Sequence, residues 1–237
     1  MKVLAINSSS LGRKGNTEII LEGFLGGLQE AGAEVEKVYT KELDIRPCLG
    51  KLACWIKTPG KCCQQDDMAL LLEKFAEADI WVFATPLYWD GVTGPLKNLF
   101  DRMLPLLEPN IELFAGHCRH PLRKNVKQGK IVLISTCGFW ESDNFEPLVV
   151  HIKAICKNIH REFAGALLRP HGAHLKYMIK HDNQANEILK ASHAAGVELA
   201  KTGQISQHTL VNVSKELLPR EEYIKRVNGN FKRLLTN

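Results

Sequence analysis

The sequence predicts an α/β domain built on a doubly wound, parallel β-sheet of five strands. Segments of strand character alternate with segments of helical periodicity between residues 1 and 203, and this alternation is typical of right-handed β-α-β units. Two strand segments, 79–85 and 130–135, are almost continuously apolar, as expected where helices cover both faces of a sheet. With five strands, the order 2-1-3-4-5 is favoured.

The first unit consists of an apolar strand, Val3–Ile6, a loop rich in serine and glycine, Ser8–Asn16, and a helix from Thr17. A helix start offers unpaired N–H groups and a partial positive charge, and glycines let the backbone approach a ligand closely. The loop therefore favours phosphate binding, although it matches neither GxGxxG nor GxxxxGKS/T. The alternative is an ordinary turn in which Asn16 or Thr17 caps the helix.

The remaining elements follow from the same hydrophobic periodicities. The alternating segment Glu34–Tyr39 is a half-buried strand, 44–67 is irregular, and 104–128 is a long basic connection. Further strands are expected at 79–85, 130–135 and 163–168, and helices at 66–78, 92–103, 144–160 and 182–202.

A C-terminal extension, 204–237, follows the domain formed by 1–203 and contains one amphipathic segment, 221–227. Because the domain formed by 1–203 already has its five helices, it has little use for another. We therefore expect the extension to pack on a neighbouring subunit and to give a homodimer or homotetramer. Two chains would then shape each ligand pocket.

Composition and charge narrow the class of protein. Apolar residues make up 45% and charged residues 24% of the 237 residues, as in globular proteins. No apolar run is long enough to span a membrane, and the N-terminus resembles a strand rather than a signal peptide, so we expect a cytoplasmic protein without membrane association. The net charge of +5 is concentrated at 117–130 and in the tail. Aromatic residues are not interleaved there, so we expect no nucleic-acid partner.

Three chemically unusual loops follow the first, third and fourth strands: SSSLGRKGNT, TPLYWDGVTG and STCGFWE. In a doubly wound sheet these loops meet at the carboxyl ends of the strands, where ligands bind. Taken jointly, the Gly-Asn-Thr ending, the Pro-x-Tyr-Trp-x-Gly loop and the following Gly-Pro-Leu-Lys resemble the flavodoxin-like FMN-binding oxidoreductases. Within them, the chain is most similar to the NADPH-dependent FMN reductase and iron–sulfur flavoprotein group, over about residues 1–200.

The resemblance implies an FMN site made by these three loops. The first loop would hold the phosphate, the second would line the isoalloxazine ring, and the third would close the other side. The residues implied are, in that order, Ser8, Ser10, Arg13, Gly15, Asn16 and Thr17; Pro86, Leu87, Tyr88, Trp89, Asp90 and Gly91; and Thr136, Cys137 and Gly138. For Tyr88 and Trp89 the alternative is core packing, and we expect Cys137 to be an inert buried thiol.

The segment 44–67 holds four of the seven cysteines, namely Cys48, Cys54, Cys62 and Cys63. Iron–sulfur members of the resembled family carry Cys-x2-Cys-x2-Cys and a fourth cysteine, but Lys51 stands at the second place here. A 4Fe–4S cluster normally needs four thiolates, so we expect no bound cluster unless Cys63 substitutes in a rebuilt loop. No histidine lies in the segment to complete a zinc site. We therefore predict a lid over the flavin.

By this resemblance the chain is expected to be an FMN-dependent NAD(P)H oxidoreductase. A nicotinamide would pass a hydride to the flavin, and a quinone, a flavin or another acceptor would receive the electrons. Hydride transfer needs no side-chain acid or base, so we name no catalytic residue. Two alternatives stay open: an iron–sulfur flavoprotein-like electron-transfer protein reduced by ferredoxin, and a binding protein without flavin. The motifs do not identify the electron acceptor, and they do not show whether NADH or NADPH is the electron donor.

Overall fold

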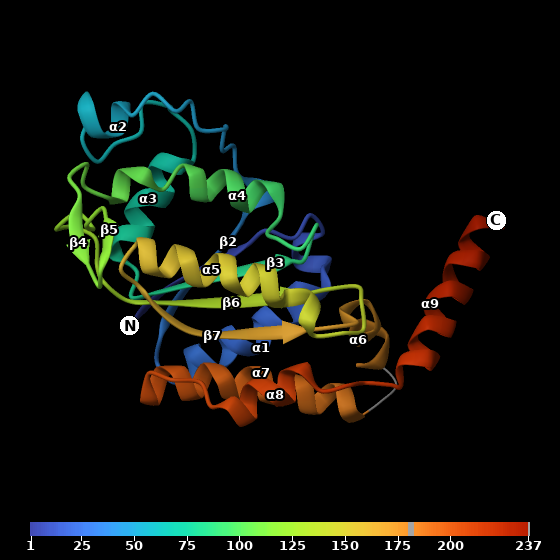
Figure 1. Ribbon diagram of the computed structural model, residues 1–237. Coiled ribbons are helices and arrows are strands. Elements are labelled where there is room, and N and C mark those ends of the chain that lie inside the picture. The colour runs from blue at the N-terminus through green and yellow to red at the C-terminus, as the bar shows by residue number, and fades with distance from the viewer. Residues whose placement is uncertain (180–182, 237) are drawn as a thin grey trace.

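The computed structural model describes residues 1–179 and 183–236. In this part of the chain, a parallel sheet of five strands has the order β2-β1-β3-β6-β7 (Figure 1), which confirms the predicted order 2-1-3-4-5. The strands are β1 (Lys2–Asn7), β2 (Glu34–Tyr39), β3 (Ile80–Pro86), β6 (Lys130–Thr136) and β7 (Glu162–Arg169).

Helices cover both faces of the sheet (Figure 1). Along β3, Trp81 and Phe83 pack against one helical layer, whereas Val82 and Ala84 pack against the other. Because side chains alternate between the faces of a strand, one continuously apolar strand serves both cores. The layer against Trp81 contains α3 (Met68–Glu77), α4 (Gly94–Asp101) and α5 (Glu146–Asn158), and the opposite layer contains α1 (Asn16–Glu30) and α7 (Asn183–Thr202).

Helices α1 and α7 are in close contact through glycines. A Cβ atom at Gly27 would collide with the carbonyl oxygen of His193, and one at Gly196 with that of Phe24. The two backbones therefore approach each other where any side chain would hold them apart. This contact fixes the position of α1, whose first turn lies at the candidate site.

Three helices begin later than the sequence predicts, among them α5, which begins at Glu146 rather than at 144. Helix α4 begins at Gly94 rather than at 92, because Thr93 donates its N–H to Thr85 Oγ1 and its hydroxyl to the carbonyl oxygen of Ser8, each at 3.2 Å. Helix α3 begins at residue 68 rather than 66. The predicted helix start at Asp182 lies outside the described residues. No helix in the described ranges is both long and apolar enough to cross a membrane.

The cysteine-bearing segment 44–67 lies against the layer of α3 and α4 (Figure 1). It contains a short helix, α2 (Ala53–Ile56), whose Trp55 donates its indole N–H to the carbonyl oxygens of Leu104 and Leu107 at 3.2 and 3.0 Å. The Trp55 ring also lies 4.6 Å from that of His120. These contacts tie the segment beside α4 rather than over the flavin loops, so this arrangement does not show the predicted lid.

The connection between α4 and β6, which the sequence marks only as long and basic, contains a two-stranded antiparallel hairpin. Its strands are β4 (Glu112–Phe114) and β5 (His117–Arg119). His120, which stacks near Trp55, follows β5 directly. His120, together with Arg123 beside Gly60, therefore places part of this connection against the cysteine segment.

The C-terminal extension packs in part on its own chain, which differs from the expectation. Helix α8 (Gln207–Ser214) packs on α7 and β7, and Ile205, Val213 and Leu217 belong to the core on that face. The folded unit therefore continues past the predicted boundary at 203. Beyond it, α9 (Arg220–Leu235) projects away from the domain (Figure 1).

Candidate functional site

The carboxyl ends of the strands lie level with one another. The register pairs Asn7 with Tyr39 and Ala84, and it pairs Thr136 with Pro86 and Arg169. The loops after β1, β3, β6 and β7 therefore leave the sheet along one edge, where doubly wound sheets bind ligands.

The loop after β1 is held by hydrogen bonds to the sheet. The Ser8 hydroxyl donates to the carbonyl oxygen of Ala84 at 3.2 Å, and the Ser9 N–H donates to Asn7 Oδ1 at 2.8 Å. Asn7, Ser8 and Ser9 are all buried. A 3-10 turn, Gly12–Lys14, completes the loop, and Gly12 adopts a φ of 50° that favours glycine. The loop is thus shaped by the protein before any ligand binds.

The first turn of α1 is open to an anion. Its N-cap is Gly15, with no side-chain cap, so the alternative in which Asn16 or Thr17 caps the helix is wrong. The first-turn N–H groups and the helix dipole therefore remain available for a phosphate. A Cβ at Gly15 would lie 2.6 Å from Ser9 Oγ, which explains why the loop carries glycine here. The Ser10 hydroxyl lies 3.4 Å from that of Tyr88 and joins this loop to the next.

Besides Ser8 and Ser10, two more of the side chains predicted to hold the phosphate have protein partners. The hydroxyl groups of Thr17 and Thr136 share a hydrogen bond of 2.8 Å and are buried. The Arg13 guanidinium forms an ion pair with Glu42 and lies 4.2 Å from the centre of the Tyr39 ring. In this arrangement the anion-binding capacity of the loop rests on its backbone N–H groups. The Thr17–Thr136 bond also joins the start of α1 to the end of β6.

Glu18 is a structural residue of the site that the sequence analysis missed. Its buried carboxylate accepts hydrogen bonds from Asn7 Nδ2 at 2.6 Å, from Lys37 Nζ at 2.7 Å and from the Tyr39 hydroxyl. Burial and the Glu18 carboxylate raise the pKa of Tyr39. The network fastens α1 to the ends of β1 and β2 below the phosphate loop. The available signal was an acidic residue in the first turn of a helix that follows a strand ending in asparagine.

The loop after β3 forms a tight turn. Tyr88 and Gly91 exchange two backbone hydrogen bonds of 3.1 Å, and between them Trp89 and Asp90 have φ values of 48° and 57°. Consecutive left-handed residues mark a type I′ turn. Each costs roughly 1 kcal/mol without glycine, and such backbone strain often accompanies function. The Trp89 side chain is 100% exposed, so the core-packing alternative is wrong for Trp89.

A cavity of about 480 Å³ lies between this turn and the loop after β6. The Leu87 N–H donates to the carbonyl oxygen of Thr136 at 2.8 Å and closes the cavity on the side of the sheet. The buried Cys137 thiol donates to the carbonyl oxygen of Phe139 at 3.3 Å, and burial raises its pKa, which makes it a poor nucleophile. We call this hollow the ring cavity; it is lined by Leu87, Trp89, Asp90, Cys137, Gly138 and Phe139.

The end of β7 binds the C-terminal extension to this site. Arg169 is fully buried and donates to the carbonyl oxygens of Val213 and Lys215 at 2.9 and 2.6 Å, and to His171 Nε2 at 2.9 Å. His171 Nε2 also accepts the N–H of Leu217 at 3.1 Å. We call residues 213–223 the C-terminal strap. Arg169 and His171 did not stand out in the sequence; the available signal was an arginine and a histidine at the end of an apolar strand.

The strap ends at the loop that closes the ring cavity. The Tyr223 hydroxyl donates to the carbonyl oxygen of Gly138, and the Trp140 indole N–H donates to that of Leu218 at 3.0 Å. The His171 N–H donates to the carbonyl oxygen of Phe139 at 2.6 Å. The loop after β6 is therefore held from one side by β7 and from the other by the strap.

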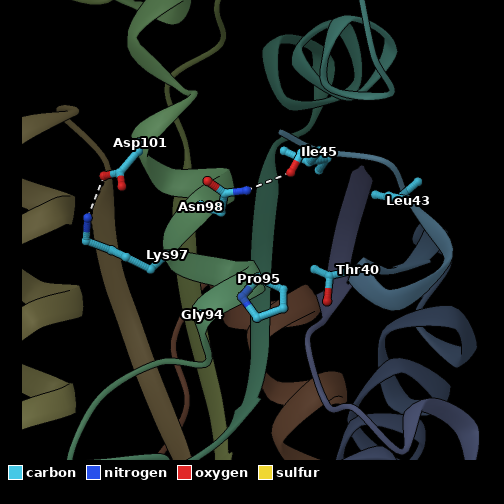
Figure 2. Close-up of a pocket in the computed structure, with 8 residues that line it drawn as sticks. All are labelled: Thr40, Leu43, Ile45, Gly94, Pro95, Lys97, Asn98 and Asp101. Atoms are coloured by element: carbon cyan, nitrogen blue, oxygen red, sulfur yellow. Dashed lines mark hydrogen bonds and ion pairs between the residues drawn. The ribbon is translucent and has the colours of Figure 1, made fainter. Parts of the chain in front are cut away.

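A second cavity, of about 460 Å³, lies between the end of β2 and α4, and Figure 2 shows its lining. Its polar side chains have partners: Lys97 pairs with Asp101 at 2.5 Å, and Asn98 Nδ2 donates to the carbonyl oxygen of Ile45 at 2.6 Å. It shares no lining residue with the ring cavity. Because its polar groups bond to each other, we do not assign the flavin to it.

The cysteine segment as folded here does not fit a four-thiolate cluster. In the described part of the chain, no three His, Cys, Asp or Glu side chains converge on a point that would hold a metal ion. Cys48 and Cys63 are exposed, and burial together with the neighbouring Cys62 raises the pKa of Cys54. Lys51 occupies the second place of the motif. No step of the chemistry below is assigned to these cysteines.

The comparison of the sequence with known proteins identifies a family. Residues 1–147 match the family model described as NADPH-dependent FMN reductase. An iron–sulfur flavoprotein of Archaeoglobus fulgidus is 43% identical over 102 residues, which cover 43% of this chain and 48% of that protein. Another from the same organism is 35% identical over 138 residues, covering 58% of this chain and 56% of its own. The chain thus spans about half the length of these relatives.

Solved structures show the same fold. An FMN-dependent NADH-azoreductase of Bacillus anthracis, solved in complex with FMN, gives a TM-score of 0.62 at 15% identity and covers 84% of this chain and 99% of that one. The family model covers more than half of this chain and includes all three loops of the candidate site. The chain therefore belongs to the NADPH-dependent FMN reductase family.

Proposed function

We propose that this protein is an FMN-dependent NAD(P)H oxidoreductase that reduces a small-molecule acceptor such as a quinone or a flavin. The observation that carries the proposal is the cavity of about 480 Å³ between the turn after β3 and the loop after β6, beside the uncapped start of α1. A ligand with a planar ring at one end and a phosphate at the other fits this pair of features. FMN has this form, so the residues present fit the cofactor that the family implies.

Bound FMN would supply the redox chemistry, which is the exchange of a hydride and electrons. The residues of this chain would bind and orient it. The first turn of α1 would hold the phosphate through N–H groups, and Leu87 and Cys137 would form opposing walls around the ring. The exposed Trp89 stands at the turn, where its ring would cover a planar substrate and exclude water from it.

We infer that the protein forms a homodimer or homotetramer through α9. This helix leaves Ile224, Leu234 and Leu235 exposed, the last at 85%. Large apolar side chains at the end of a projecting helix are typical of a contact with another chain. The strap would carry that contact to the loop at Gly138, so assembly would act on the flavin site.

A second candidate function is an electron-transfer flavoprotein that receives electrons from ferredoxin. Its support is the 43% identity to an iron–sulfur flavoprotein and the cysteine segment. Lys51, which occupies the second place of the cysteine motif, disfavours it. Iron analysis of anaerobically purified protein separates the two, because a 4Fe–4S cluster requires about four irons per chain.

The proposal is tested by a fluorescence titration of the protein with FMN. In Gly15→Ala, the added methyl group would lie 2.6 Å from the buried Ser9 Oγ and 3.2 Å from the carbonyl oxygen of Gly12, so Ser9 must rotate and the loop must shift slightly to admit it. Because overpacking typically costs 1–3 kcal/mol, we expect FMN to bind about tenfold more weakly. Gly26→Ala, in the same helix, is the matched control, because its Cβ would meet only an ordinary contact at 3.6 Å.

Two outcomes contradict the proposal. If wild-type protein binds no FMN, the fold lacks its implied cofactor and the function fails. If Gly15→Ala and Gly26→Ala bind FMN equally and both remain folded by circular dichroism, the phosphate does not lie at α1. Steady-state oxidation of NADPH by the FMN-loaded protein then distinguishes the enzyme from a passive carrier.

A further inference from the structure

A third cavity, of about 800 Å³, lies between the loop after β6, helix α6 (Gly172–Met178) and helix α9. It shares Gly138 with the ring cavity, so the two hollows lie on either side of one loop residue. The Tyr223 hydroxyl bonds to the carbonyl oxygen of this glycine and fixes the wall between them. The lining comprises Gly138, Ala173, His174, Tyr177, Tyr223, Arg226, Val227, Gly229, Asn230, Phe231 and Arg233.

The cavity is cationic on the side of α9. The Arg226 guanidinium donates to His174 Nε2 at 3.1 Å and pairs with Glu222 at 2.7 Å. Burial and then the charge of Arg226 lower the pKa of His174, which keeps its ring a neutral acceptor near pH 7. Arg233 donates to Asn230 Oδ1 at 2.8 Å, and within the described residues no carboxylate forms an ion pair with it. Its positive charge therefore remains uncompensated at the cavity.

The same cavity presents aromatic rings. Tyr177 and Phe231 are 55% and 58% exposed, and the ring of Tyr177 lies 5.4 Å from that of His174. Exposed rings offer a planar base a stacking surface, and guanidinium groups bind phosphates through paired, charge-assisted hydrogen bonds. Rings and guanidinium groups together form a surface suited to a nucleotide.

We propose that this cavity binds the adenosine-phosphate end of the reduced nicotinamide dinucleotide, with its phosphates at Arg226 and Arg233. The inference rests on the proposed function, because it places the two ends of one substrate in the two hollows that Gly138 separates. The nicotinamide end lies in the ring cavity, beside the flavin loops. The adenine stacks at Tyr177 and Phe231, and the volume of about 800 Å³ is that of a small-molecule site.

The C-terminal extension thus becomes part of the substrate site. Arg169 and His171 anchor the strap, the strap positions α9, and α9 supplies the guanidinium groups. A chain with the same sheet but without α9 would keep the flavin loops and lose this subsite. The competing occupant is a second copy of this chain that fills the cavity itself at Tyr177 and Phe231, rather than one that meets α9 only at its exposed end.

Binding of adenosine 2′,5′-bisphosphate to the full-length, FMN-saturated protein tests the inference by isothermal titration calorimetry. We expect Arg233→Gln and Arg226→Gln each to weaken binding about tenfold, the value of one charge-assisted hydrogen bond to a phosphate. Lys232→Gln is the matched control, since it removes the same charge from the neighbouring residue of α9, which does not line the cavity. FMN affinity, measured on the same samples, is expected to stay unchanged in all three variants.

The outcomes separate this inference from the proposed function. Equal binding of the bisphosphate by wild type and both arginine variants overturns the subsite, whereas FMN binding and NADPH oxidation then still stand. Undetectable binding by wild type, with a molecular mass that falls in Arg226→Gln or Arg233→Gln, overturns it in favour of a second copy. Binding that needs both arginines in protein that holds no FMN supports the subsite and contradicts the oxidoreductase.

Discussion

Acid is expected to release the C-terminal strap through His171. This residue is fully buried, and its Nε2 accepts hydrogen bonds from Arg169 and from the N–H of Leu217. Protonation at Nε2 would remove that acceptor and place a second positive charge beside the guanidinium. Burial and, next, the charge of Arg169 lower the pKa of His171 from 6.5 to about 4.

The magnitude follows from this difference in pKa. The unfolded chain takes up the proton at a higher pH than the folded chain, so stability present above pH 6.5 is lost as the pH falls toward 4. A pKa difference of about 2.5 units (6.5 less 4) corresponds to about 3 kcal/mol in total, at about 1.4 kcal/mol per unit. Between pH 7 and pH 5, about 2 kcal/mol of this is lost.

Urea unfolding at pH 7, 6 and 5 measures this loss. In His171→Asn the titrating group is absent, and asparagine tolerates the φ of 41° at this position. We expect wild type to lose about 2 kcal/mol more than His171→Asn between pH 7 and pH 5. His208→Asn, on the exposed side of α8, should follow wild type. Equal losses in wild type and His171→Asn would refute the reasoning.

Two further predictions concern the buried ion pair between Asp66 and Arg102 and the exposed end of α9. In Asp66→Asn, the almost fully buried Arg102 guanidinium loses the carboxylate that it meets at 2.8 and 2.9 Å, so urea unfolding should show a loss of about 3–5 kcal/mol. Asp101→Asn, in an exposed pair, should cost less than about 1 kcal/mol, and a similar cost for both would contradict the argument. Truncation after Tyr223 keeps the strap but removes the exposed end of α9, so light scattering should report a monomer, and an unchanged mass would place the contact elsewhere.

Local patterns of apolar residues were sufficient to predict the strands of the sheet. The strands at 79–85 and 130–135 were predictable because continuous apolar runs have few stable placements other than a sheet covered on both faces. The turn from β1 into α1 was predictable because glycine, serine and a following helix act within about ten residues; that it holds a phosphate stays a prediction, based on the way helix starts bind anions. The Tyr-Trp-Asp-Gly turn was found as a motif, although its two left-handed residues were not.

Other parts of the site depend on residues far apart in the sequence. Arg169 binds Val213 across 44 residues, and Tyr223 binds Gly138 across 85. No local periodicity records such a contact, since a buried arginine and a solvated one look alike in sequence. The lid was predicted from the position of the cysteines in the sequence, whereas Trp55 and its partners around Leu104 decide where that segment lies.

The sequence by itself determined the strand order, the glycine- and serine-rich loop before α1 and the family resemblance, because side-chain alternation and helix-start chemistry are properties of neighbouring residues. Only the tertiary structure decided that Glu18 fastens the loop, that the extension returns to the sheet, and that α9 walls a cationic cavity beside Gly138. These features arise where buried charges must find partners, and the partners come from whichever segment the packing brings close.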